Sequence, residues 1–240
     1  MLSFYSRVFD TVEVDATVYG IPPSSTLKKW YVETPSEFTF SLKTPREITH
    51  EGALSDDTFP LMREFVERVS ELREKLAVIL IQLPPHFDAS RENARKVRKF
   101  IAELPRGIKY AIEFRHVDWF VGWTFEELNK NNISLALVDG PWMPRERVFD
   151  AARKLRPQFS YIRLMNSRDL ERFDRITRYR DDDLEQWLVR IEKLQSNEIY
   201  IYIDNYFEGF APETANRLKT RLGCKVVNPA TVTDQPSLFG

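Results

Sequence analysis

The sequence predicts an α/β barrel of the TIM type, and two observations support that prediction. Seven short runs of β-forming residues recur along the chain, each followed by a stretch with helical spacing, and this order is typical of parallel α/β folds. A charged or amide residue also stands at or near the C-terminal end of nearly every run. In a parallel barrel those ends form the rim on which active sites are built. The runs are Thr11–Val14, Phe38–Leu42, Ala77–Leu83, Tyr110–Phe114, Ser134–Val138, Ser160–Met165 and Ile199–Ile203.

Alternation along each run predicts which side chains point into the barrel. Ile112 and Phe114 share the face of the fourth run that meets the helices. Glu113 and Arg115 share the opposite, inward face. The same parity turns the polar residues of other runs inward, namely Glu13, Asp15, Ser41, Lys43, Gln82, Arg163 and Asp204. Because buried polar groups are costly unless they are paired or used, this ring indicates a site.

Helical spacing and capping residues predict the helices between the strands. Ser24–Thr26 offers N-cap hydroxyls, and Asp56 opens a long helix. The acidic run Asp181–Asp183 is interpreted as a first turn favoured by the helix dipole, rather than as a metal loop. The predicted helices are Leu27–Glu33, Asp56–Lys75, Ser90–Glu103, Thr124–Asn131, Arg145–Leu155, Asp181–Gln195 and Pro212–Leu222. The long irregular stretches Thr44–Ser55 and Asn166–Arg180 follow strand ends, as active-site loops do.

Length and composition favour one globular domain. The chain has 240 residues, of which 42% are hydrophobic and 13% aromatic, enough for a sizeable core. We expect a single barrel domain over residues 1–240, with a C-terminal tail from about residue 223. The formal net charge of -1 gives no general electrostatic argument for binding nucleic acid or an anionic membrane.

The cysteine count and the N-terminus set the expected compartment. Cys224 is the single cysteine, which excludes an intrachain disulfide and a zinc site built from cysteines. The first residues lack the layout of a signal peptide, and no apolar run reaches the length of a membrane span. We therefore expect a cytoplasmic protein with no membrane partner.

The densest group of reactive side chains follows the fourth run. Glu113, Arg115 and His116 are suited to supply a general acid/base and an anion clamp, and Trp119 a stacking wall. The alternative is an internal Glu113–Arg115 ion pair that satisfies itself. Gln82 precedes two prolines and either binds a ligand at the barrel mouth or orients Glu113 on the neighbouring strand.

Cations and carboxylates are mixed at the predicted mouth. Lys43, Arg115 and Arg163 are its inward cations. Carboxylates stand at four strand ends: Glu13, Glu113, Asp139 and Asp204. A mixed set suits an anionic substrate bound beside an acid/base pair, and it suits a mutually neutralising network equally well.

Three histidines leave a metal site open as an alternative. His50, His86 and His116 each follow a strand end, and with Glu113 they form a ligand set for a divalent metal such as zinc. No spacing such as H-x-x-x-H supports that set. No cofactor is predicted, because the chain has no P-loop, no G-x-G-x-x-G and no G-x-S-x-G motif.

Several segments, in consistent order between about Phe4 and Leu222, resemble one known family. They are Phe9–Tyr19, Phe38–Lys43 with Ile48–His50, Gln82–Pro85, Glu113–His116 with Trp119, Tyr161–Arg163, and Tyr202–Asn205. Together they are similar to the DUF72 family, also called YecE-like, a TIM-barrel family of uncharacterised function. The resemblance implies a barrel whose shared polar mouth includes Glu13, Lys43, His50, Gln82, Glu113, Arg115, His116, Arg163 and Asn205.

The sequence departs from that family in two ways. The strand with a Gly-x-x-Gly-Trp-like segment that usually opens the family is missing, which agrees with the count of seven runs. Either the barrel is open between its first and last strands or the gene start was placed too late. An open edge needs cover from a terminal segment or a partner chain, so we expect a homodimer. Asp15, Val18 and Asp204 stand where Asn, Phe and Asn are usual, which indicates a more acidic pocket.

These observations favour an enzyme, of the hydrolase or lyase class, that acts on a small anionic or phosphorylated substrate. The expected catalytic residues are Glu113, Arg115, His116 and Glu13. The expected substrate-binding residues are Lys43, His50, Gln82, Arg163, Asp204, Asn205, Tyr19 and Trp119. The alternatives are a metal-dependent phosphodiesterase or nuclease-like barrel, and a protein that binds a ligand or nucleic acid without turnover. For nucleic acid the basic loop Arg168–Arg180 is the better candidate, ahead of Arg91–Arg98.

Overall fold

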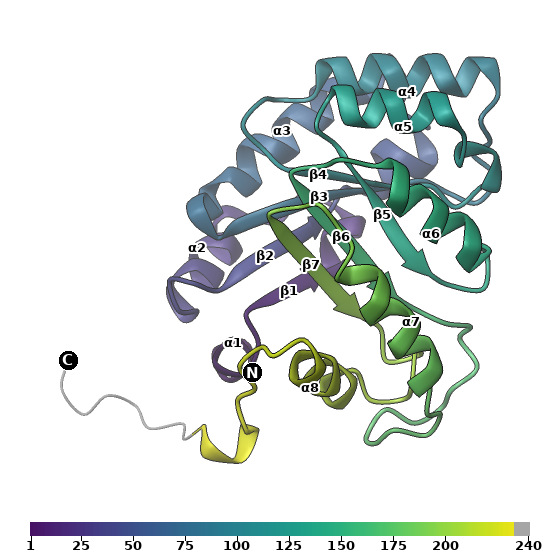
Figure 1. Cartoon of the computed structure of the whole chain (residues 1–240). Helices are drawn as coiled ribbons and strands as arrows, with labels where there is room; N and C mark the ends of the chain where they lie inside the picture. Colours follow the sequence, from purple (N-terminus) through teal and green to yellow (C-terminus); the bar gives the residue numbers. More distant parts are fainter. Residues whose placement is uncertain (233–240) are drawn as a thin grey trace.

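Seven parallel strands form one sheet that curls into a nearly closed barrel (Figure 1). The computed structural model describes residues 1–232. Neighbouring strands pair in sequence order from β1 to β7, so the predicted fold class and strand count are confirmed. The strands are β1 (Thr11–Val14), β2 (Thr39–Lys43), β3 (Leu76–Gln82), β4 (Tyr110–Glu113), β5 (Ser134–Asp139), β6 (Phe159–Leu164) and β7 (Glu198–Ile203).

Helices cover the outside of this barrel (Figure 1). They are α1 (Leu2–Val8), α2 (Ser24–Glu33), α3 (Phe59–Val69), α4 (Arg91–Glu103), α5 (Gly122–Lys130), α6 (Arg145–Lys154), α7 (Asp181–Ile191) and α8 (Ala211–Arg221). Within residues 1–232, none of them has the length and apolar character needed to cross a membrane. The acidic run Asp181–Asp183 forms the first turn of α7, as predicted.

Two details of the predicted helices are wrong. The helix expected over Asp56–Lys75 consists instead of a 3-10 turn, α3 and a second 3-10 segment, Ser70–Lys75, within which Arg73 has a φ of 51° and breaks the helical path. The hydroxyls expected to cap α2 do not do so: Pro23 is the N-cap, and Ser24 donates instead to Glu71 at 2.5 Å. The predicted C-terminal tail begins after α8, and its residues 233–240 lie outside the described part of the chain.

The predicted alternation of side chains is confirmed by two separate cores. Ile112 and Phe114 belong to the larger core, between the sheet and the helices. Val78, Ala111 and Tyr161 belong to a smaller core inside the barrel. Inward parity therefore carries Glu113 and Arg163, on the same strands as these residues, to the barrel interior.

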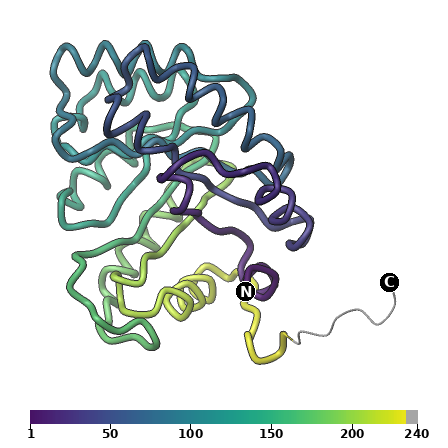
Figure 2. Tube along the Cα trace, turned by 180° about the vertical axis from the view of Figure 1, so that it is seen from behind, coloured from purple at the N-terminus to yellow at the C-terminus, as the bar shows by residue number. Residues whose placement is uncertain are grey.

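The barrel is open between its first and last strands. No backbone hydrogen bond joins β1 to β7 within residues 1–232, and neither strand pairs with a second neighbour. The helices α1 and α8 lie on either side of this opening (Figures 1 and 2).

Lys75 provides a test of how α2 is anchored to the barrel. Its side chain is buried, and Nζ donates to the carbonyl oxygens of Tyr31 and Thr34, both at 2.7 Å. A cation there satisfies carbonyls at the helix C-terminus and complements the helix dipole. We expect Lys75→Met to lower the free energy of unfolding by about 2–3 kcal/mol, because buried acceptors lose their donor. Urea unfolding measures the change; Lys28→Met, at an exposed position of the same helix, is the control. Equal stability of the two variants would contradict the assignment.

Candidate functional site

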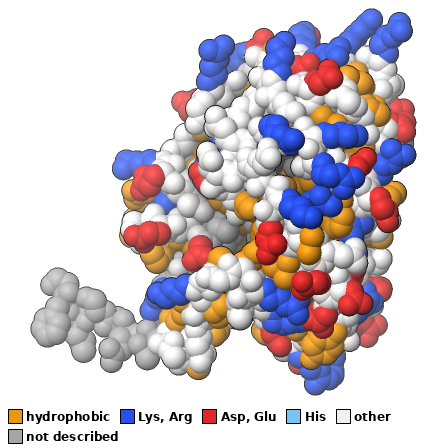
Figure 3. Space-filling view, viewed as in Figure 1, with side chains coloured by type: hydrophobic (Ala, Val, Ile, Leu, Met, Phe, Trp, Pro, Cys, Tyr) orange, Lys and Arg blue, Asp and Glu red, His pale blue; other side chains and the backbone are white. Residues whose placement is uncertain are grey.

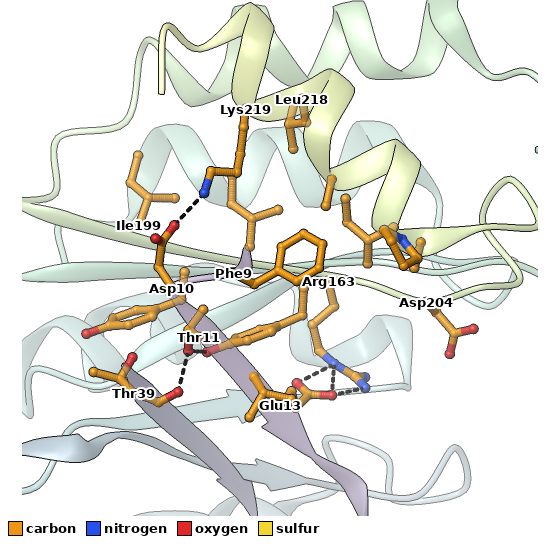
Figure 4. Close-up of a pocket in the computed structure, with 18 of the residues that line it drawn as sticks. Phe9, Asp10, Thr11, Glu13, Thr39, Arg163, Ile199, Asp204, Leu218 and Lys219 are labelled. Carbon is orange, nitrogen blue, oxygen red and sulfur yellow. Dashed lines mark hydrogen bonds and ion pairs between the residues drawn. The ribbon is translucent and has the colours of Figure 1, made fainter. Parts of the chain in front are cut away.

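A network of charged side chains fills the C-terminal mouth of the barrel, with Arg163 at its centre. The Arg163 side chain is 5% exposed and reaches carboxylates on two different strands. It donates to Glu13 from Nε at 2.9 Å and from Nη2 at 2.7 Å, the bidentate geometry visible in Figure 4. Nη1 donates to Glu113 Oε2 at 2.5 Å. Arg163 therefore joins β1 to β4 through the barrel interior, and its predicted role as an anion clamp stays a prediction.

Glu113 is fully buried and its carboxylate accepts from three side chains. Besides Arg163, the donors are Arg115 Nε at 2.7 Å and Gln82 Nε2 at 3.1 Å, both to Oε1. Burial alone would raise the pKa of Glu113, but the charges of Arg163 and Arg115 with these hydrogen bonds outweigh it and lower the pKa to about 2. The group is ionised at neutral pH, which makes it unsuited to the predicted acid/base role. The Glu113–Arg115 ion pair and the contact with Gln82 that the alternative interpretation predicted are present, but the pair does not satisfy itself, because Glu113 also bonds Arg163.

Glu13 is held in the same way on the opposite side of the barrel. Its carboxylate accepts from the Tyr161 hydroxyl at 2.6 Å and lies 3.6 Å from Lys43 Nζ. Lys43 also forms an ion pair with Asp15 at 2.5 Å, and the Asp15 side chain is 73% exposed. Glu13 is thus an anchor for two cations rather than a group available for catalysis.

Arg115 is held on one side of its guanidinium only. Within residues 1–232 its single hydrogen bond runs from Nε to Glu113, and its guanidinium carbon lies 4.7 Å from the ring centroid of Trp142. The side chain is 22% exposed. Its two terminal nitrogens have no protein partner in this part of the chain, so the guanidinium is fixed in orientation yet retains free donors.

His50 is a titratable group whose pKa is affected by the cations of this network. Its ring is half-buried, and Nδ1 is 2.9 Å from the Thr49 hydroxyl. Burial, followed by the charges of Arg115 and Arg46, lowers the pKa of His50 below its ordinary value. The imidazole is therefore neutral at pH 7 and able to accept a proton.

The alternative metal set is not assembled. Glu113 is occupied by its three donors, and His86 is exposed. His116 Nδ1 accepts from the backbone N–H of Asp118 at 3.4 Å, so its ring caps a local turn and does not reach Glu113. In the part of the chain that is described, no three side chains among His, Cys, Asp and Glu are grouped as metal ligands.

Two predicted aromatic residues do not line the mouth. Trp119 is fully buried in the outer core: it stacks on Phe114 at 4.3 Å and donates from Nε1 to the Phe87 carbonyl at 2.7 Å. Tyr19 is 83% exposed at the end of the 3-10 segment Asp15–Tyr19. Strand alternation does not extend past the strand end, which is why the orientation of both rings was mispredicted.

Asp139 ties the barrel to its helices instead of joining the network. It accepts from Trp187 Nε1 at 2.7 Å and pairs with Arg145 at 3.0 Å. Arg180 and Arg145 both contact Asp183 at the start of α7. This cluster fastens α6 and α7 to the end of β5.

Asp204 and Asn205 line a groove of about 830 Å³ between β1 and β7, to which Glu13, Asp15 and Arg163 also contribute, but neither residue has a side-chain hydrogen bond or ion pair to the network within residues 1–232. Asp204 accepts from the backbone N–H of Tyr206 at 2.8 Å, and Asn205 from that of Ala211 at 2.9 Å. Figure 4 shows the Asp204 carboxylate away from the Glu13–Arg163 pair.

Two residues of the mouth were not predicted from the sequence. Tyr161 shares the inward face of Arg163, and that parity was the signal for its contact with Glu13. Trp142 stands in a loop that the isolated bridge Gly140–Met143 turns back toward Arg115, and no local pattern signals that turn.

Comparison with known proteins places the chain in a family. Residues 1–237 match the family described as "Protein of unknown function DUF72". The chain is 27% identical over 233 residues to UPF0759 protein YecE of Escherichia coli K12, covering 90% of this chain and 84% of that protein. It is 26% identical over 239 residues to UPF0759 protein YunF of Bacillus subtilis 168, with the same coverage.

Solved structures agree with this. A DUF72 family protein from Enterococcus faecalis V583 superposes with a TM-score of 0.77 at 21% identity, covering 94% of each chain. One from Thermotoga maritima MSB8 gives 0.73 at 26% identity, covering 92% of this chain and 88% of that one. The chain belongs to the DUF72 family, as its sequence motifs indicated.

Proposed function

We propose that this protein is an enzyme that binds a small anionic substrate at the barrel mouth through Arg115. One observation carries the proposal: Arg115 is fixed by Glu113 and Trp142, but its terminal nitrogens have no protein partner in the described residues. A planar guanidinium with two parallel donors matches a carboxylate or a phosphate. A cation oriented in advance binds such a group at a low entropic cost.

The buried carboxylates serve this cation by fixing its position. Glu113 neutralises part of the charge of Arg115 and Arg163 and sets the plane of the Arg115 guanidinium. Lys43, whose partner Asp15 is exposed, is the second cation available when Asp15 gives way to a ligand. These roles replace the predicted catalysis by Glu113 and Glu13.

His50 is the group that we assign to proton transfer. The pKa of His50 is lowered by burial and by the charge of Arg115, the cation that would hold the substrate, so the ring is neutral at pH 7. General-base catalysis needs a group that is unprotonated at working pH and can still accept a proton. The neutral His50 ring meets both conditions, whereas the ionised Glu113 carboxylate already accepts hydrogen bonds from three side chains. The arrangement suits hydrolysis or elimination on an anionic substrate.

Nucleic-acid binding is the second candidate, and one observation favours it. Arg168, Arg172 and Arg175 are exposed and form no ion pair within residues 1–232, and Phe173 between them is 37% exposed. Arginines interleaved with aromatic rings suit a single-stranded nucleic acid. Against it, basic and acidic side chains are interspersed on the face shown in Figure 3, without the basic patch that such binding needs.

The proposal predicts separate effects on binding and on turnover. Arg115→Gln should weaken binding of inorganic phosphate about tenfold or more, because it removes a charge-assisted pair. His50→Gln should leave phosphate binding within about twofold and abolish hydrolysis of any phosphate or carboxylate ester that the wild type turns over. Calorimetry and a screen of chromogenic esters provide the two measurements.

Arg95→Gln is the matched control, because Arg95 is an exposed arginine of α4 that forms no ion pair within residues 1–232. Phosphate binding that is unchanged in Arg115→Gln, or lost equally in Arg95→Gln, would overturn the proposal.

A further inference from the structure

A pocket of about 370 Å³ lies on the outside of the barrel, between α6 and α7. The two helices run side by side there (Figure 1), and Phe149 on α6 meets Trp187 on α7 edge to face, with ring centroids 5.0 Å apart. The lining residues are Glu146, Phe149, Asp150 and Arg153, which share one face of α6 through their spacing of three and four residues, together with Arg147 and Arg190. None of these six takes part in the charged network at the mouth within residues 1–232.

Arg190, on α7, is a cation in this pocket without an acidic partner in the described part of the chain. Its guanidinium carbon lies 4.9 Å from the centroid of the Phe149 ring, which restrains the group. Nε is buried and donates to no acceptor within residues 1–232. Burial, followed by the charge of Arg153, lowers the pKa of Arg190, and the charge of Asp150 offsets only part of this effect. Because a buried donor without an acceptor is costly, an oxyanion beside Arg190 would be bound favourably.

The other charges around the pocket do not supply that anion. Asp150 is shared by two cations, since it forms ion pairs with Arg153 and with Lys154, the latter at 3.6 Å. Arg147 and Glu146 are exposed, and neither forms an ion pair within residues 1–232. In and beside the pocket, four cations therefore face two carboxylates, and this excess of positive charge attracts anions.

We propose that the pocket between α6 and α7 binds a small molecule that carries a phosphate or phosphonate group on an apolar body. Arg147 and Arg190 hold the oxygens, because planar guanidinium groups present parallel donors that match such a group. The half-buried Phe149 ring is the apolar wall. The volume of about 370 Å³ lies in the usual range of small-molecule pockets and leaves room for a body beyond the anionic group. This site is independent of the one proposed at the mouth.

The test is calorimetric titration with benzylphosphonate, whose C–P bond resists hydrolysis. It is carried out on Arg115→Gln protein, which lacks the cation proposed for the mouth, so that the pocket is measured whether or not the mouth binds anions. We expect benzylphosphonate to bind about fivefold more tightly than inorganic phosphate, because its ring is buried against Phe149.

Substitutions in this background identify the residues that hold the anion. Arg190→Gln should weaken binding of benzylphosphonate at least about tenfold, and Arg190→Lys less, because lysine keeps the charge but not the planar donors. Arg147→Gln, at a more exposed position, should weaken it about threefold. Arg95→Gln on α4 is the control and should not change it. If Arg190→Gln does not fold, Arg190→Lys and Arg147→Gln decide the question.

Three results contradict the proposal. One is the absence of measurable binding of benzylphosphonate to the Arg115→Gln protein. Another is binding that the Arg147 and Arg190 variants leave unchanged or that Arg95→Gln weakens equally, which would mean that the anion lies elsewhere. The third is benzyl alcohol binding as tightly as benzylphosphonate, which would make the pocket a site for apolar molecules without a role for its arginines.

Discussion

Arg163→Met is expected to lower the free energy of unfolding by about 3–5 kcal/mol, the cost of breaking a buried ion pair by removing one partner. The substitution leaves Glu13 and Glu113 buried at 9% and 0% side-chain exposure without their shared cation. Methionine approximates the length of the aliphatic stem, so the loss reflects charge and hydrogen bonds more than volume. Urea unfolding at neutral pH provides the measurement.

The matched comparison for this variant is Arg115→Met. Arg115 gives Glu113 one hydrogen bond and is 22% exposed, so its loss should cost clearly less than that of Arg163. Adding Glu13→Gln and Glu113→Gln to Arg163→Met should restore part of the stability, because the uncompensated charges are then gone. Equal losses for the two arginine variants would show that Arg163 does not organise the network.

The second large effect is on the pH dependence of stability, through Glu113. Its pKa is about 2 in the folded protein against 4.5 ordinarily. A carboxyl whose folded pKa is depressed contributes stability that is fully present above its unfolded pKa and is lost as the pH falls toward its folded pKa. At roughly 1.4 kcal/mol per pKa unit, the stability lost between pH 4.5 and 2 is about 3 kcal/mol.

Glu113→Gln isolates this contribution. The variant should be less stable than the wild type at pH 7, and its stability should change less between pH 4.5 and 2.5. Glu67→Gln should follow the wild-type pH profile, because Glu67 is an exposed glutamate of α3 with no ion pair in the described part of the chain. A Glu113→Gln profile parallel to that of the wild type would mean that Glu113 is not the titrating group.

Much of the barrel was predictable because a strand buried on both sides imposes a period of two. The parity that separates Ile112 from Glu113 assigned the inward residues, and sequential strand order placed Gln82 beside Glu113. Gln82 and Glu113 are paired neighbours on β3 and β4, and their hydrogen bond follows directly from that register. The interior of the site therefore followed from pattern alone.

The remaining features of the site depend on tertiary contacts that no local sequence pattern indicates. Arg163 had several inward carboxylates in reach, and it bonds both Glu13 and Glu113 because the barrel brings β1 and β4 to opposite sides of it. Trp119 and Trp142 follow strand ends, where alternation no longer applies. The Trp119 ring lies in the outer core, and the Trp142 ring packs against Arg115. The predicted catalytic roles of Glu13 and Glu113 could not be judged from the sequence for the same reason, because the chemistry open to a carboxylate depends on how many hydrogen bonds it already accepts.

Side-chain NMR of the arginine Nε–H groups during a titration with inorganic phosphate tests the central claim most directly. The claim is that Arg115 is the cation held ready for a ligand, whereas Arg163 is committed to Glu13 and Glu113. Saturable movement of the Arg115 signal, identified by its absence in Arg115→Gln, with a stationary Arg163 signal is the predicted result. Movement of Arg163 instead, or a stationary Arg115 at phosphate concentrations that saturate binding, would contradict the account.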